Sequence, residues 1–225
     1  MTSAEKILSF YKSLQIKEKL PKGVEVLNPY RNEQTFALCE RFYKKYYHDE
    51  RERKIILGIN PGRFGAGLTG IPFMDPLKLE HLCNIKSDFP KKSELSADFI
   101  HLVIQSYGGL DDFFHDIYIN SVSPLGFTLE GKNLNYYDSP ALLKSLEPFI
   151  LSSLRTQINF GVSRDVAYCL GEGANFKYLS RVNEREKFFG EIIPLAHPRF
   201  VMQYKRKFVK QYVDDYVRKL SIKKD

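Results

Sequence analysis

The chain has 225 residues, 43% of them hydrophobic, and a net charge of +7. This length suits a single α/β domain spanning 1–225 with a substantial core. No run of about 18 apolar residues and no signal-peptide pattern occurs, so we expect an intracellular, cytoplasmic protein that does not cross a membrane. The positive charge is compatible with a polyanionic partner but identifies no reaction.

The first 20 residues predict an amphipathic helix, with Thr2 and Glu5 at the spacing of a capping box. We expect helices within residues 1–50 to pack on an α/β core. Short apolar segments then predict strands, and the intervening periodicity predicts helices. The predicted strands are 54–60, 116–122, 166–171 and 191–197. The predicted helices after the second strand are 139–161, with a kink or break at Pro148, one from about 175, and one from 201 to about 222.

Strands that alternate with helices predict a parallel sheet with helices on both faces. We therefore expect an α/β fold, a three-layer α/β/α sandwich around a short, mostly parallel sheet of four strands. The segment 126–138 has the weakest pattern, and we interpret it as a surface loop.

The three cysteines, Cys39, Cys83 and Cys169, are far apart and odd in number. This spacing fits neither a disulfide framework nor a metal site, so we expect small buried side chains. The sequence predicts no metal and no cofactor.

Polar residues stand at three predicted strand ends: Asn60, Asn120 and His197. The carboxyl ends of parallel strands meet at one edge of a sheet, where ligands bind. The topology therefore predicts that these three side chains cluster. Each residue also has an ordinary structural interpretation. Asn60 would begin a turn before Pro-Gly, Asn120 would hydrogen-bond its own backbone at the strand end, and His197 would be a partly buried imidazole with its hydrogen bonds satisfied.

The stretch LGINPGRFGAGLTGIPF (57–73) follows the first predicted strand and is rich in glycine. It matches neither the phosphate-binding G-x-x-x-x-G-K-[ST] motif nor the dinucleotide G-x-G-x-x-G motif. The interpretation that is left is a loop whose backbone can approach a flat ligand closely, because glycine has no Cβ to keep the ligand away. Phe73 would offer a ring for stacking on that ligand, although core packing is the ordinary role of a single Phe.

Three motifs in this order resemble the uracil-DNA glycosylase superfamily. The stretch N-P-G-R-F-G-A-G-L-T-G-I-P-F (60–73) resembles the first motif of the single-strand-selective monofunctional uracil-DNA glycosylases. The middle motif is Y-I-N-S-V-S-P-L-G-F (118–127), and the His-Pro motif is L-A-H-P-R-F (195–200). With Q-S-Y-G-G (105–109) and H-P-R-F-V-M-Q-Y (197–204), the whole chain is most similar to a bacterial, second-type branch of that family.

The resemblance implies excision of uracil, and of related lesions, from DNA. It implies that Asn60 positions the attacking water and that His197 stabilises the charge on the leaving base. It further implies that Asn120 reads the edge of uracil, that Phe73 stacks on the flipped base and that Gly62 leaves room for it. Ala66 and Gly67 would lie near the 5-substituent of the base. No lysine occupies a matching position for covalent attack, so we expect a monofunctional glycosylase without a lyase step.

The His-Pro motif departs from the family pattern H-P-S-P-R, because Arg follows His-Pro directly. Either Arg199 or Phe200 would then be the residue that enters the duplex. Lys205 and Arg206 would contact DNA phosphates, and binding should weaken with salt. Lys207 and Lys210 are more typical of a solvated helix face.

The expected partner is uracil-containing DNA, single- or double-stranded, bound by a monomer. The alternative from another class is a non-catalytic nucleic-acid-binding protein of the same fold. A nucleotide-binding or dehydrogenase-like enzyme is disfavoured, because the phosphate-binding motifs are missing.

Overall fold

The computed structural model describes residues 1–221 and is built on a four-stranded parallel sheet. Its strands are β2 (Arg53–Gly58), β3 (Ile117–Ser121), β6 (Val162–Leu170) and β7 (Glu191–Leu195), in the order β3-β2-β6-β7. The sheet and its four strands confirm the sequence prediction, and each strand ends one or two residues earlier than predicted. β2 and β3 are almost entirely buried, as expected for strands covered on both faces.

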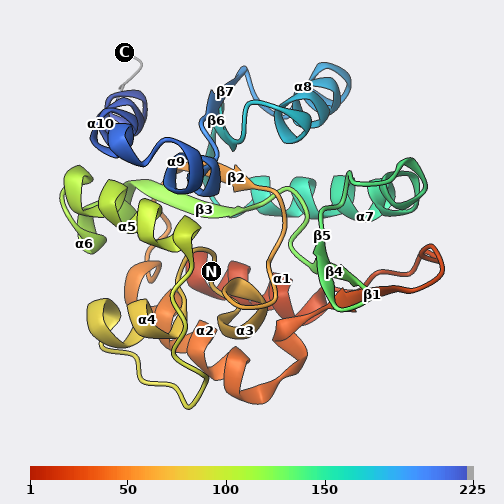
Figure 1. The fold of residues 1–225 in the computed structure, drawn as a ribbon, viewed down its shortest axis with the longest axis horizontal. Coiled ribbons are helices and arrows are strands. Elements are labelled where there is room, and N and C mark those ends of the chain that lie inside the picture. The colour runs from red at the N-terminus through yellow and green to blue at the C-terminus, as the bar shows by residue number, and fades with distance from the viewer. Residues whose placement is uncertain (222–225) are drawn as a thin grey trace.

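Helices cover both faces of this sheet, giving the predicted three-layer sandwich (Figure 1). On one face, the Tyr47 hydroxyl after α2 donates to the carbonyl of Ile117 at 3.0 Å. On the other, the Tyr168 hydroxyl of β6 donates to the carbonyl of Lys219 in α10 at 2.8 Å. The helices are α1 (Ser3–Ser13), η1 (Pro29–Arg31), α2 (Glu33–Tyr46), α3 (Ala66–Thr69), α4 (Pro76–Cys83), α5 (Leu95–Tyr107), α6 (Leu110–Asp116), α7 (Pro140–Ile158), α8 (Ala174–Glu186), α9 (Pro198–Tyr204), η2 (Arg206–Phe208) and α10 (Val209–Leu220).

The predicted N-terminal helix and its capping box are present, but the helix does not cover the first 20 residues: α1 ends at Ser13. Thr2 and Glu5 form both hydrogen bonds of the capping box at the start of α1.

The three cysteines are free thiols and are buried, as expected. Within residues 1–221, no helix combines the length and apolarity that a membrane span requires.

The prediction of a surface loop over 126–138 is wrong. This segment contains β4 (Gly126–Leu129) and β5 (Lys132–Leu134), which join β1 (Val24–Leu27) in an antiparallel sheet of order β1-β4-β5. The hairpin turn has φ of 50° at Glu130 and 70° at Gly131, a left-handed pair that matches the twist of the two strands. Pairing with the distant β1, which has no local sequence signal, turns this polar segment into a sheet.

The prediction of one helix from 201 to about 222 is also wrong. The chain forms α9, then η2, then α10, with the break at Lys205. The predicted end at Ile222 lies outside the described residues. In contrast, α7 continues through Pro148.

Candidate active site

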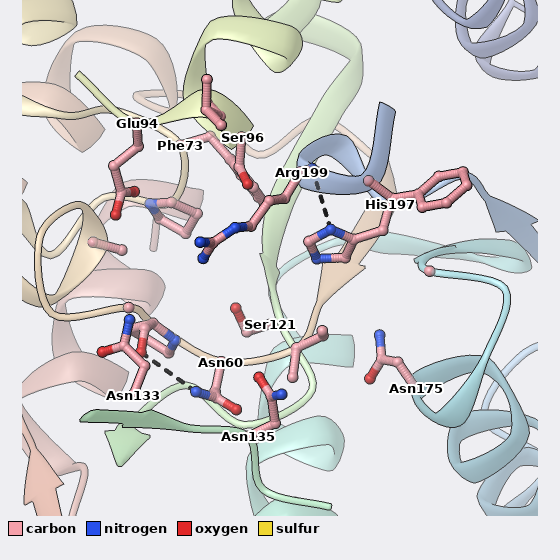
Figure 2. A pocket seen from close by; sticks show the side chains of 18 of the residues that line it. Asn60, Phe73, Glu94, Ser96, Ser121, Asn133, Asn135, Asn175, His197 and Arg199 are labelled. Atoms are coloured by element: carbon pink, nitrogen blue, oxygen red, sulfur yellow. Dashed lines mark hydrogen bonds between the residues drawn. The ribbon is translucent and has the colours of Figure 1, made fainter. Parts of the chain in front are cut away.

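A cavity of about 850 Å³ opens at the carboxyl ends of the four parallel strands. Its walls come from segments that are far apart in sequence (Figure 2). They are the Gly-rich loop after β2, the stretch before α5, the end of β3, the segment after β5, the start of α8 and the turn into α9. Among residues 1–221, no three His, Cys, Asp or Glu side chains come together as a metal site.

Asn60 lines the cavity two residues after the end of β2. Its Nδ2 donates to the carbonyls of Leu134 at 3.2 Å and Pro61 at 3.4 Å, and its Oδ1 accepts from the N–H of Tyr136 at 3.0 Å. These partners fix which end of the amide is oxygen. A carbonyl oxygen has two lone pairs, so Oδ1 can accept one more hydrogen bond.

His197 lines the cavity at the start of α9, directly after β7. Its Nδ1 accepts from the backbone N–H of Arg199 at 3.2 Å, so the proton of the neutral ring is on Nε2. Burial, reinforced by the charge of Arg199, lowers the pKa of His197 to about 4. In Figure 2 the free ring nitrogen lies on the cavity side. The side chain is therefore a neutral hydrogen-bond donor at pH 7.

Phe73 lines the cavity and has a left-handed backbone, with φ of 58°. Thr69 holds the turn before it, because its hydroxyl donates to the carbonyl of Met74 at 2.7 Å and accepts from the N–H of Ile71 at 3.2 Å. The ring reaches Gly58, where a Cβ would lie 3.6 Å from its Cζ. The Thr-Gly-Ile-Pro-Phe sequence thus builds a fixed ring at the cavity floor.

The glycines of the loop serve different purposes. Gly62 and Ala66 line the cavity, as predicted, but Gly67 does not. A Cβ on Gly67 would lie 2.6 Å from the carbonyl oxygen of Gly62, so this glycine lets the loop fold on itself. At Gly65, the occupied space belongs to the carboxylate of Glu94.

The placement of Asn120 corrects the predicted three-residue cluster. Its side chain is 1% exposed, and its Nδ2 donates to the hydroxyls of Tyr11 and Tyr118 in the core. Successive residues of a strand point to opposite faces, so it is Ser121 that lines the cavity. Asn60 and His197 come together there, whereas Asn120 faces α1, and its predicted base-reading role does not fit this position.

Two of the four predicted DNA-binding residues, Arg199 and Phe200, lie at the cavity; Lys205 and Arg206 do not line it and are exposed. Figure 2 shows the guanidinium of Arg199 directed across the cavity.

The sequence prediction missed polar residues that the tertiary fold adds to the cavity. Among them are Glu94, Ser121, Asn133, Asn135 and Asn175. Burial and the nearby Asp75 raise the pKa of Glu94. Glu94 directly precedes α5, and no sequence motif marked it as part of a site. For the asparagines, no sequence signal pointed to the site.

Comparison with known proteins identifies the family of this chain. The model of the uracil DNA glycosylase superfamily matches residues 45–221, and the chain belongs to that superfamily. Membership places it among the DNA glycosylases, with DNA as the class of substrate. The fold also matches the crystal structure of wild-type Pedobacter heparinus SMUG2, with a TM-score of 0.95, 46% identity and coverage of 97% of each chain. No curated protein sequence matches the chain.

Proposed function

We propose that this protein hydrolyses the N-glycosidic bond of uracil in DNA as a monofunctional glycosylase. One observation carries the proposal: a neutral His197, with its proton on Nε2, faces the cavity that Asn60 and Phe73 also line. A base inside a duplex is inaccessible, so the target nucleotide must be flipped into this cavity, at a cost of a few kcal/mol. Family membership supports the same reaction class.

The reaction develops negative charge on the leaving base. As the C1′–N1 bond breaks, its electrons move onto uracil, and Nε2–H of His197 donates to the oxygen where that charge appears. A donor that is already neutral and fixed by Arg199 needs no proton transfer to act. Phe73 would stack on the flipped ring.

The nucleophile is a water held by Asn60. Its Oδ1 has one lone pair left beside the bond from Tyr136, enough to orient a water molecule. An amide is a poor base, so this arrangement suits a reaction in which the sugar already resembles an oxocarbenium ion when water arrives. As the water oxygen bonds to C1′, the proton that it loses neutralises the departing uracil anion, and the products are free uracil and an abasic site. A covalent lyase step would need a lysine amine in place of the water. Among residues 1–221, Lys92 is the only lysine that lines the cavity, and its Nζ lies over the Phe64 ring, 5.3 Å from the ring centre.

Incubation with a uracil-containing oligonucleotide, followed by alkali, tests the proposal. We expect strand scission at uracil only after alkali, and no covalent adduct on addition of borohydride. Scission without alkali, or a trapped adduct, would show a lyase step and contradict the monofunctional assignment. Specific binding with no excision of uracil would instead support the non-catalytic alternative.

A further inference from the structure

The cavity wall opposite His197 is formed by a segment that Asn60 holds in place. The Asn60 amide bonds the carbonyl of Leu134 and the N–H of Tyr136, the two neighbours of Asn135. The Tyr136 side chain is fully buried, and its hydroxyl donates to Oδ1 of Asn175 at 2.7 Å. Asn135 is therefore presented to the cavity from a backbone that is fixed on both sides.

The side chain of Asn135 is also oriented. Its backbone N–H donates to Oδ2 of Asp138 at 2.8 Å, and its Nδ2 donates to Oδ1 of the same carboxylate at 3.1 Å. A carboxylate only accepts, so the amide must turn its nitrogen toward Asp138. This leaves Oδ1 and one N–H of Asn135 for a ligand, and Figure 2 shows the side chain directed toward the cavity near Ser121.

The carbonyl oxygen of every other asparagine that lines the cavity within residues 1–221 already accepts one hydrogen bond from the protein. The oxygens of Asn60 and Asn175 accept from Tyr136, and that of Asn133 accepts from the backbone of the Gly-rich loop. Among the cavity asparagines within residues 1–221, Asn135 alone has a carbonyl oxygen that accepts no hydrogen bond.

We propose that Asn135 reads the edge of the flipped base, the role that the buried Asn120 cannot perform. The inference rests on the proposed function. Oδ1 would accept from N3–H of uracil, and the free N–H would donate to a neighbouring carbonyl of the base. Cytosine presents an acceptor at N3 and a donor at C4, so the same amide would mismatch it twice.

Ser121 leaves space for this contact. The position of a Cβ on Gly58 lies 3.5 Å from the Ser121 hydroxyl and 3.6 Å from Cζ of Phe73. The hydroxyl and the ring on which the base would stack therefore both border the backbone of Gly58. Because serine is short, a longer side chain from the facing wall can reach the base edge.

Oligonucleotides that contain deoxyuridine or N3-methyldeoxyuridine test the proposal. The methyl group removes the proposed N3–H donor. For the wild-type protein, we expect both equilibrium binding and single-turnover excision to favour uracil by about 10- to 100-fold, since an unmatched polar pair is left behind. For Asn135→Ala, the rate on uracil should fall by a similar factor, and the preference over N3-methyluracil should shrink to within about threefold.

Asn133→Ala is the matched control. It also removes an amide that lines the cavity, but the oxygen of this amide already accepts from the backbone N–H of Arg63. It should keep the wild-type preference, and the melting temperature of each variant reports folding. Two results would overturn the proposal. One is that Asn135→Ala keeps the wild-type preference for uracil over N3-methyluracil. The other is that the single variant Ser121→Ala loses this preference.

Failure of the proposed function has a different signature. If the wild type excises neither substrate but binds uracil-DNA better through Asn135, the catalytic assignment fails while the base-reading role is supported. If the wild type binds both oligonucleotides equally, the role of Asn135 is contradicted whether or not uracil is excised.

Discussion

The carboxylate of Glu94 occupies the space where Gly65 would carry a side chain. An added Cβ on Gly65 would lie 1.9 Å from Oε2 of Glu94 and 2.6 Å from its Cδ. The backbone of Glu94 is fixed in turn by Asp75, a fully buried carboxylate paired with Lys78 at 2.8 Å. The Gly-rich loop and the stretch before α5 therefore fit together as two walls of one cavity.

Gly65→Ala should disrupt this fit. We expect a loss of about 1–3 kcal/mol in the free energy of unfolding, typical of overpacking, together with slower uracil excision. Glu94→Ala in the same chain should restore much of the stability, because it removes the clashing group. Urea unfolding of the single and double variants measures this coupling. Equal losses in Gly65→Ala with and without Glu94 would contradict the contact.

The depressed pKa of His197 predicts an unusual pH profile. The neutral form persists until the pH falls to about 4, so excision should stay independent of this group from neutral pH down to about pH 5. Between pH 6.5, its ordinary pKa, and about pH 4, the unfolded chain binds a proton that the folded chain does not. The free energy of unfolding should therefore decrease as the pH is lowered through that window. Nitrogen NMR of the imidazole should report a neutral ring with the proton on Nε2. A titration near 6.5 would show the assignment to be wrong.

Removal of the His197 donor should affect the chemical step. His197→Ala is expected to slow single-turnover excision of uracil by about 100- to 1000-fold, as for other donors to a developing anion, with little change in DNA binding. His81→Ala, on the exposed surface of α4, is the matched control and should leave the rate unchanged. A similar loss in both variants would point to a general effect on folding.

Asn60→Ala should release the segment that carries Asn135. Two backbone hydrogen bonds, to residues 134 and 136, would be lost, each contributing about 1 kcal/mol. We expect faster amide hydrogen exchange at Tyr136 and slower excision. Exchange in α1, which lies on another part of the fold, provides the internal reference. Unchanged protection at Tyr136 would remove the basis for this positioning role.

Lys205 and Arg206 should act through phosphates alone. Each substitution by Ala is expected to lower the slope of log K against log salt by about 0.7–0.9 for DNA binding, without changing the excision rate at saturating DNA. Lys44→Ala, in an exposed position of α2, is the charge-matched control and should leave the slope as it is. An unaltered slope in both Lys205→Ala and Arg206→Ala would place the DNA path elsewhere.

The sequence determined the parts of this protein that depend on local pattern. Buried apolar runs fixed β2, β3, β6 and β7, and their alternation with helices fixed a parallel sheet with covered faces. The rule that ligands bind at carboxyl ends of strands then brought Asn60 and His197 together correctly, and the three motifs pointed to the superfamily to which the chain belongs.

Tertiary structure decided what local pattern could not. Strand alternation, shifted by one residue, sends Asn120 into the core and Ser121 into the cavity. Pairing of β4 with β1, about a hundred residues earlier, makes a sheet from a polar segment and leads Asn135 to the site. The glycines share one composition but differ in purpose, because steric room depends on which neighbour arrives: a carbonyl at Gly67, a carboxylate at Gly65. Such contacts join residues distant in sequence, so only the folded chain specifies them.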